Sequence, residues 1–256
     1  MKEKSLFEII DIESLPLGNA LMKLRPCSGK MPDMEPGQFV NILVPDTPGA
    51  FLRRPISICN VCDGLLWLFI KAAGTGTRHL CSMKAGEKLD IVLPLGNGFT
   101  MPESKDARIL LIGGGVGIAP LLYFGIRLRE QGYNPRFLLG GATADSLQLL
   151  DEFKKAGEVY ITTDDGSCGV RGTVLAHDII RSQTDRFYCC GPTPMMKGVA
   201  ALAREMNVDC EVSLENRMAC GLGACLCCVE DTIEGHRCVC SWGPVFNTKE
   251  LKWHES

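Results

Sequence analysis

The segment MACGLGACLCC, residues 218–228, holds four of the fourteen cysteines of the chain in eleven positions. Its spacing is Cys220-x4-Cys225-x2-Cys228, and Cys238 and Cys240 follow as candidates for a fourth position. C-x4-C-x2-C with a distant fourth cysteine is the spacing of plant-type [2Fe–2S] sites. The glycines between the thiols allow a tight loop whose amides approach the sulfur atoms. The segment therefore predicts a [2Fe–2S] cluster.

Other uses of the thiols compete with this interpretation. A zinc site would take Cys225, Cys228, Cys238 and Cys240, but zinc pairs are usually two C-x2-C knuckles, and Cys220 would be left without a role. Inert buried thiols are a further alternative. Disulfides are disfavoured because the N-terminus has acids within its apolar stretch and is not a secretory signal, which predicts a reducing, cytoplasmic location.

Two glycine-containing turns are candidates for binding a dinucleotide. LLIGGGVGIAP, residues 110–120, runs from a strand to a helix, where backbone amides and the helix dipole favour a pyrophosphate. CCGPTPMM, residues 189–196, would place Cys190 at the carboxyl end of a strand, within reach of a nicotinamide. An ordinary tight turn and a buried thiol remain the alternatives for these two segments.

FLRRPISIC, residues 51–59, carries Arg53 and Arg54 directly before a proline and a strand. An arginine pair held on a sheet can clamp a pyrophosphate. The Gly-Thr segment AAGTGT at residues 72–77 supplies a second turn that could hold phosphate. Taken alone, the arginines are equally consistent with the solvated start of a strand.

The elements that must position these residues fall into two patterns. Up to about residue 100, six apolar segments separated by Pro and Gly predict an antiparallel barrel, with segments at 6–15, 19–26, 38–45, 53–61, 65–72 and 87–96. From about residue 107, five strands alternate with helical segments, including one at 174–183, which predicts a parallel sheet. Ligands of such a sheet bind outside the carboxyl ends of its strands. The cysteine-rich tail follows from about residue 216.

Composition excludes several classes of protein. The 256 residues are 46% hydrophobic with a net charge of −3, and no basic patch suggests nucleic-acid binding. The most apolar window, residues 109–126, is broken by glycines and reads as strand, turn and helix, so no membrane span is expected. No side-chain pairing typical of nucleophilic or acid–base catalysis is apparent, and no catalytic residue is predicted.

The order R-x-x-S, G-x-G-T, GGGVGIAP and CGP-x-P-M-M resembles the ferredoxin–NADP reductase superfamily, in which an FAD-binding barrel precedes a nicotinamide-binding α/β domain. Adding E-x-R-M-x-C-G-x-G-x-C-x-x-C and C-x-x-GPVF, essentially the whole chain resembles the electron-transfer subunits of the NAD-linked (class 1B) bacterial dihydroorotate dehydrogenases. Ile56 stands where the superfamily usually has tyrosine, so aromatic stacking on the flavin is lost there.

The resemblance implies a set of cofactor positions. Those on the FAD side are Arg54, Pro55, Ile56, Ser57, Phe69, Ile70, Lys71, Gly76 and Thr77. Those on the nicotinamide side are Gly113, Gly114, Gly115, Val116, Gly117, Cys190, Gly191 and Pro192. For the cluster it favours Cys220, Cys225, Cys228 and Cys240, because GPVF follows Cys240 with the family spacing.

The resemblance also implies an activity and a partner. Electrons from an FMN-containing dihydroorotate dehydrogenase subunit would pass through the [2Fe–2S] cluster and FAD to NAD+ in pyrimidine biosynthesis, with two copies of each subunit. The implied domains are a barrel at 1–101, an α/β domain at 102–213 and a cluster-binding tail at 214–256. The hypothetical docking surface is formed by Met218, Leu222, Leu226 and Trp242.

Related flavin and cluster subunits serve hydrogenases, sulfide-linked reductases and ferredoxin–NADP transhydrogenases, and these stay as alternatives. A zinc-stabilised nucleotide-binding regulator without redox activity is the alternative from another class.

Overall fold

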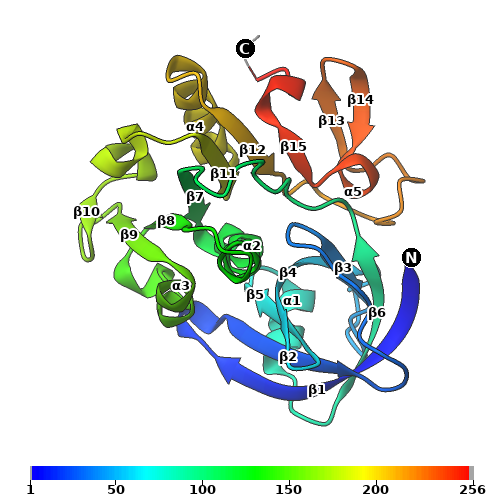
Figure 1. Cartoon of the computed structure of the whole chain (residues 1–256). Coiled ribbons are helices and arrows are strands. Elements are labelled where there is room, and N and C mark those ends of the chain that lie inside the picture. Colours follow the sequence, from blue (N-terminus) through cyan, green and yellow to red (C-terminus); the bar gives the residue numbers. More distant parts are fainter. Residues whose placement is uncertain (1, 254–256) are drawn as a thin grey trace.

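The computed structural model describes residues 2–253 and arranges them as a barrel, a sheet covered by helices, and a small C-terminal part that lies beside both (Figure 1). Six antiparallel strands close the barrel in the order β1-β2-β5-β4-β3-β6. They are β1 (Glu3–Ser14), β2 (Ala20–Pro26), β3 (Phe39–Ile42), β4 (Arg54–Cys62), β5 (Leu65–Ile70) and β6 (Lys88–Leu95). The six predicted barrel strands are confirmed.

The barrel also contains one helix that the sequence pattern did not predict. Helix α1 (Thr75–Ser82) follows β5 and begins within the Gly-Thr turn. Only Gly76 and Leu80 of its eight residues are buried, so the segment lacks the apolar period by which a helix is recognised. Its position matters because its N-terminal turn lies near the start of β4.

The second part is a sheet of seven strands in the order β10-β9-β8-β7-β11-β12-β15. The five predicted parallel strands are confirmed as β7 (Ile109–Gly114), β8 (Arg136–Gly141), β9 (Glu158–Thr163), β11 (Arg186–Cys190) and β12 (Asp209–Ser213). The helices between them are α2 (Ile118–Glu130), α3 (Leu150–Ala156) and α4 (Thr193–Glu205). The carboxyl ends of β7 and β11 are adjacent, because Cys190 pairs with Gly113.

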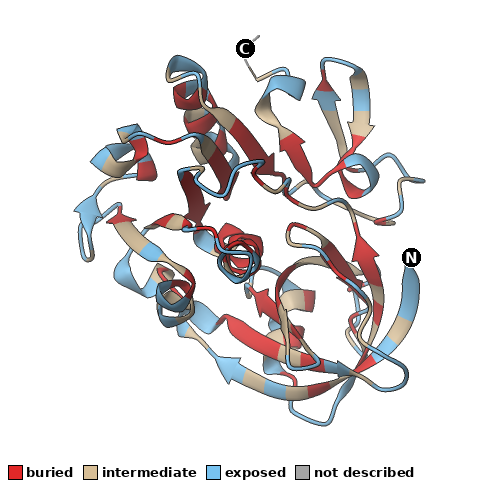
Figure 2. Ribbon diagram, viewed as in Figure 1, coloured by how far each residue is buried: buried red, intermediate tan, exposed pale blue. Residues whose placement is uncertain are grey.

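Helix α2 lies between the barrel and the sheet, and Figure 2 shows it almost completely buried at the centre of the molecule. Tyr123 of α2 packs into the barrel core, and its hydroxyl donates to the Met34 carbonyl at 2.9 Å. The sequence predicted this helix. It did not indicate that the helix is buried on two sides, because the apolar stripe of an amphipathic helix packs against one partner.

Two differences from the predicted elements have physical causes. Residues 174–183 form two short 3₁₀ turns instead of a helix, because the His177 ring accepts a hydrogen bond from the Ile179 amide and starts the second turn. The sheet gains two edge strands, β10 (Val170–Arg171) and β15 (Val245–Asn247). Strand β15 comes from the cysteine tail and pairs antiparallel with β12.

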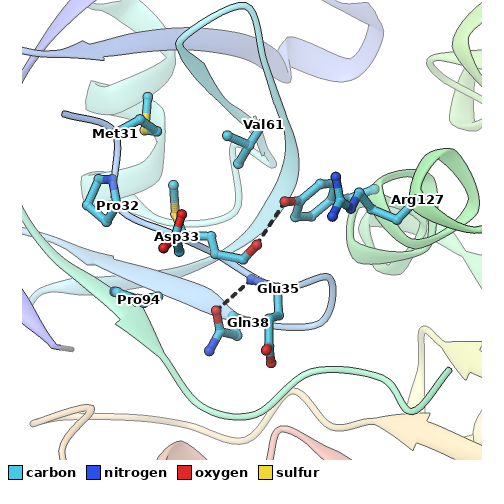
Figure 3. A pocket seen from close by; sticks show the side chains of 10 residues that line it. Met31, Pro32, Asp33, Glu35, Gln38, Val61, Pro94 and Arg127 are labelled. Atoms are coloured by element: carbon cyan, nitrogen blue, oxygen red, sulfur yellow. Dashed lines mark hydrogen bonds between the residues drawn. The ribbon is translucent and has the colours of Figure 1, made fainter. Parts of the chain in front are cut away.

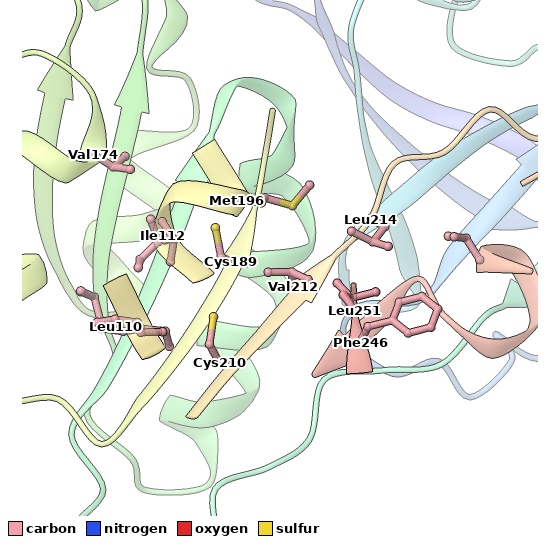
Figure 4. Packing of buried hydrophobic residues seen from close by; sticks show 14 of the residues in the cluster. Leu110, Ile112, Val174, Cys189, Met196, Cys210, Val212, Leu214, Phe246 and Leu251 are labelled. Carbon is pink, nitrogen blue, oxygen red and sulfur yellow. The ribbon is translucent and has the colours of Figure 1, made fainter. Parts of the chain in front are cut away.

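The rest of the tail is a hairpin of β13 (Val229–Thr232) and β14 (Gly235–Cys238), followed by α5 (Val239–Trp242). Its buried residues join a core shared with the other two parts. Figure 4 shows Phe246 and Leu251 packed beside Val212 and Leu214 of the α/β part. Phe39 of the barrel belongs to the same hydrophobic cluster. The tail is therefore seated on the barrel and the sheet together.

Among residues 2–253, no helix combines the length and the apolar character needed to cross a membrane.

Candidate functional site

The cysteine loop, defined as residues 216–228, connects β12 to β13 and has no helix or strand of its own. Gly221 and Gly223 adopt left-handed conformations, with φ values of +70° and +86°. A Cβ on Gly221 would approach the Asn41 side-chain nitrogen to 2.8 Å, and one on Gly223 would approach the Ser241 hydroxyl to 2.9 Å. These two positions therefore require glycine for both conformation and space.

Backbone amides point at the sulfur atoms of this loop. Leu222 N–H donates to Cys220 Sγ at 3.3 Å, Gly223 N–H to Cys240 Sγ at 3.1 Å, and Cys240 N–H to Cys228 Sγ at 3.4 Å. The bond from Leu222 lowers the pKa of the Cys220 thiol to about 6, whereas burial raises that of Cys240 to about 12. An amide directed at sulfur favours the thiolate, which is the form that binds a metal, and this effect prevails at Cys220, whereas burial outweighs it at Cys240.

The other cysteines of the tail differ in position. Cys225 and Cys227 are exposed, while Cys228 is buried. Cys238 is buried, and its thiol donates to the Gly223 carbonyl at 3.9 Å rather than receiving an amide. Within residues 2–253, no three His, Cys, Asp or Glu side chains converge closely enough to hold a metal ion as they stand. The loop offers thiols and amide donors suited to an iron–sulfur cluster, and the ligand set remains a prediction.

The segment after Cys240 is held in place by Asn97, on the connection between β6 and β7. The Asn97 side chain donates to the carbonyls of Trp242 at 3.0 Å and Val245 at 2.9 Å, and it accepts from the Val245 amide at 3.0 Å. The Leu214 amide donates to the Pro244 carbonyl at 2.8 Å. The GPVF motif thus fixes the end of the cysteine tail against the other two parts.

The structure separates the arginine pair of the FLRRPIS segment. Arg53 donates to the Asp90 carboxylate at 2.7 Å and to the Asp90 carbonyl at 3.0 Å, so it is committed to an ion pair on the barrel. Arg54 instead packs over Gly76, where a Cβ would come within 2.9 Å of the guanidinium Nε. The two guanidinium groups therefore have different partners, and a clamp made by both arginines, which the sequence suggested, does not form.

Arg54 and the N-terminal turn of α1 therefore meet, and both were predicted on the FAD side. The Thr77 hydroxyl accepts from the amides of Ala73 and Gly74, both at 3.0 Å, and so it shapes the turn internally. Pro55, Ile56 and Ser57 on β4 are half-buried.

The remaining positions predicted on the FAD side lie at the end of β5. The side chains of Phe69 and Ile70 are buried in two hydrophobic cores, which leaves only their backbone for a ligand. Lys71, which follows them, is exposed.

The two predicted nicotinamide turns lie directly against each other. They are the glycine turn, residues 113–117, and the CGP turn, residues 190–192. A Cβ on Gly117 would lie 2.5 Å from the Cys190 carbonyl carbon, so the two backbones are in van der Waals contact. Burial raises the pKa of the Cys190 thiol to about 12, which keeps it neutral. Gly115 and Pro192 are exposed at this edge, and Val116 is half-buried.

A separate pocket of about 680 Å³ lies between the barrel and the C-terminal half of α2. Its walls include Gln38, Pro94 and Arg127, and none of the predicted cofactor residues lines it (Figure 3). Two hydrogen bonds are drawn there, from the Tyr123 hydroxyl to the Met34 carbonyl and from the Glu35 amide to the Gln38 side chain at 2.8 Å.

Comparisons with known proteins agree with this arrangement. Residues 215–252 match a family model described as the iron–sulfur cluster binding domain of dihydroorotate dehydrogenase B. The electron transfer subunit of dihydroorotate dehydrogenase B (NAD(+)) from Shouchella clausii is 40% identical over 227 residues, which are 85% of this chain and 86% of that protein. The chain belongs to the family of dihydroorotate dehydrogenase B electron transfer subunits. The Fusobacterium nucleatum member is 38% identical, with the same coverage of both chains.

Solved structures support the fold. A chain of the NADH-dependent reduced ferredoxin–NADP oxidoreductase superposes with a TM-score of 0.85 and 31% identity, covering 98% of this chain and 91% of that one. Phthalate dioxygenase reductase superposes with a TM-score of 0.67 and 20% identity over 84% of this chain and 70% of its own, which shows the fold alone. The resemblance to the ferredoxin–NADP reductase superfamily and to this family is therefore confirmed.

Sequence reasoning missed Asn41 and Asn97, which hold the cysteine tail from the barrel side. The only signal for Asn41 was a single polar residue within the apolar segment FVNILV. Nothing in the sequence around Asn97 distinguishes it from an ordinary turn residue.

Proposed function

We propose that this chain is the electron transfer subunit of a dihydroorotate dehydrogenase, passing electrons from an FMN-containing catalytic subunit to NAD+ in pyrimidine biosynthesis. The observation that carries the proposal is the seating of the cysteine tail. Its strand β15 extends the sheet beside β12, and Asn41 of the barrel donates to the Cys220 carbonyl at 3.4 Å. Three candidate cofactor sites thereby belong to one packed body, as a relay requires.

The proposed cofactors are FAD, a [2Fe–2S] cluster and NAD. When bound, a flavin exchanges electron pairs with nicotinamide and single electrons with an iron–sulfur cluster. Arg54 and the first turn of α1 supply a cation and amide donors for the FAD pyrophosphate. The glycine turn and the CGP turn form a backbone edge for the nicotinamide nucleotide. Cys220, Cys225, Cys228 and Cys240 are the proposed cluster ligands.

We also propose domain boundaries near residues 101 and 213 and a cytoplasmic location. The connection between β6 and β7 contains the first boundary, and the second lies at the end of β12. All fourteen cysteines are free thiols, which fits a reducing compartment.

Reconstitution with the catalytic subunit tests the proposed function. The FAD- and iron-loaded chain, mixed with that subunit, is expected to support reduction of NAD+ by dihydroorotate, measured as absorbance at the NADH band. The catalytic subunit alone is the control. A chain that reduces dyes with NADH but fails to couple to dihydroorotate oxidation would contradict the assignment.

A second candidate is a subunit of an NADH-dependent ferredoxin–NADP oxidoreductase, favoured by the superposition with a TM-score of 0.85. The identity to that protein is 31%, against 40% to a dihydroorotate dehydrogenase subunit. Purification from the native host separates the two, because the co-purifying subunit differs.

The face around the cysteine loop is the proposed docking surface for the catalytic subunit, with two copies of each subunit in the assembly. Leu222 and Leu226 are 52% and 67% exposed, and Trp242 is 57% exposed with the Arg237 guanidinium 3.7 Å from its ring centroid. Met218 is half-buried against the core, so it contributes less than the sequence suggested. Apolar side chains exposed together around a redox centre are typical of a protein interface.

Leu222→Asp is expected to weaken co-purification of the catalytic subunit at least about tenfold, because an interface core excludes an unpaired charge. Ile233→Asp is the matched control, since Ile233 is 57% exposed in the same tail but lies at the turn of the β13–β14 hairpin. Affinity capture of the tagged chain, followed by quantification of the second subunit, gives the measurement. Equal capture by both variants would refute the docking surface.

A further inference from the structure

Asn41 is a buried polar residue in an otherwise apolar strand. It is 1% exposed in β3, where Phe39, Val40 and Ile42 are also buried. Val40 and Ile42 face the barrel core, whereas Phe39 belongs to the cluster shared with the cysteine tail. Because side chains alternate along a strand, Asn41 faces the tail as Phe39 does. A buried amide lowers stability unless its groups are hydrogen-bonded, so its presence there calls for a reason.

The amide contacts the cysteine loop at its first predicted ligand. Asn41 Nδ2 donates to the Cys220 carbonyl at 3.4 Å. A Cβ on Gly221 would lie only 2.8 Å from the same nitrogen, so the loop can approach Asn41 this closely because residue 221 is glycine. Asn41 Oδ1 is one of four buried side-chain N and O atoms in residues 2–253 that have no hydrogen-bond partner. The bond to the Cys220 carbonyl offsets part of the cost of burying this amide, which points to that contact as its role.

The backbone of Asn41 lies next to the residues proposed to contact FAD. Asn41 pairs with Pro55 across the β3–β4 ladder, so it lies beside the segment proposed to contact FAD. The Arg53 guanidinium donates to the Asn41 carbonyl at 3.3 Å and anchors that backbone to Asp90. One residue therefore connects the strand of the flavin site with the carbonyl of a cluster ligand.

We propose that Asn41 is a positioning residue that holds the Cys220 end of the cysteine loop at a fixed separation from the FAD strand. The inference rests on the proposed cofactors but not on the identity of the partner. Sites of this kind work when their side chains are locked by packing and by hydrogen bonds from outside the site. With both cofactors bound, the flavin would take a hydride from NADH and the cluster would accept electrons singly, and Asn41 would hold the loop of one against the strand of the other.

The test uses the full FAD- and iron-loaded chain without a catalytic subunit. Asn41→Leu removes the amide, and Asn41→Asp keeps its shape but removes the donor. Asn60→Leu is the matched control, because Asn60 is a buried asparagine near the other end of β4, where it bonds only to Val61 and Cys62. Stopped-flow absorbance after NADH addition reports flavin reduction and cluster reduction separately, and EPR reports the cluster environment.

Both Asn41 variants are expected to slow cluster reduction about tenfold, the size typical of residues that orient metal ligands. They should also change the EPR spectrum of the reduced cluster and speed amide hydrogen exchange at residues 219–224. Flavin reduction by NADH should match the wild-type rate, and Asn60→Leu should leave all four readouts unchanged. Loss of iron at full FAD content in the Asn41 variants alone would also support the proposal.

Unchanged cluster reduction and EPR in both Asn41 variants would overturn it, as would equal effects from Asn60→Leu. These outcomes are independent of the dihydroorotate assay. If that assay fails while the Asn41 effects appear, only the proposed partner is wrong.

Discussion

Cys220→Ser is expected to remove the iron from this protein while NADH still reduces its flavin. Cys220 begins the C-x4-C-x2-C spacing, and its sulfur receives the Leu222 amide at 3.3 Å. A serine hydroxyl does not ionise near neutral pH as a thiol does, so one of four ligands is lost. Arg54, the glycine turn and the CGP turn are all outside the cysteine loop, and so the flavin and nicotinamide sites stay intact.

The measurement combines iron analysis, EPR after reduction and NADH-dependent dye reduction. Iron per FAD is expected to fall at least about tenfold, with dye reduction within about twofold of wild type. Cys227→Ser is the matched control, because Cys227 is an exposed thiol in the same loop and is not among the proposed ligands.

Cys238→Ser is a second control, since the Cys238 thiol donates to a carbonyl, whereas Cys240 Sγ accepts the Gly223 amide. Full retention of the reduced-cluster signal in Cys220→Ser would contradict the ligand assignment.

Gly117→Ala is expected to slow the reduction of the flavin by NADH, at the end of the electron pathway opposite to the cluster. The added Cβ would lie 2.5 Å from both the carbonyl carbon and the oxygen of Cys190, and neither backbone atom can rotate away. The glycine turn and the CGP turn must then separate, which moves the edge proposed to bind the nicotinamide. A misplacement of about 1 Å can cost about a hundredfold in rate, and overpacking typically costs about 1–3 kcal/mol of stability.

Stopped-flow reduction of the flavin by NADH measures the first effect, and denaturant unfolding measures the second. Gly198→Ala is the control, because a Cβ at that position in α4 would meet only the end of the Leu175 side chain, at 2.8 Å. Iron content should stay at the wild-type level in both variants. A wild-type rate of flavin reduction in Gly117→Ala would show that the contact between the two turns does not position the nicotinamide.

Local patterns along the chain were sufficient for much of this protein. The turn residues and apolar alternation predicted all six barrel strands, and the strand–helix alternation predicted the five parallel strands. The cysteine spacing indicated a [2Fe–2S] loop, because ligands carried on one short loop must be close whatever the rest of the chain does. The prediction of a helix at 174–183 was wrong. Over so few residues, the hydrogen bond from the Ile179 amide to the His177 ring outweighs the intrinsic helix propensity of the segment.

Contacts between distant segments were decided only by the tertiary structure. The sequence by itself determined that there is a barrel, a parallel sheet and a thiol-rich tail, since each has its own local pattern of spacing. It did not determine that β15 would extend the sheet, that Arg53 would turn away from Arg54, or that Asn41 would reach a carbonyl 179 positions away. Those outcomes depend on which surfaces are buried together when the three parts pack. Contacts between distant segments produce no periodic pattern in the sequence, so they cannot be predicted from it.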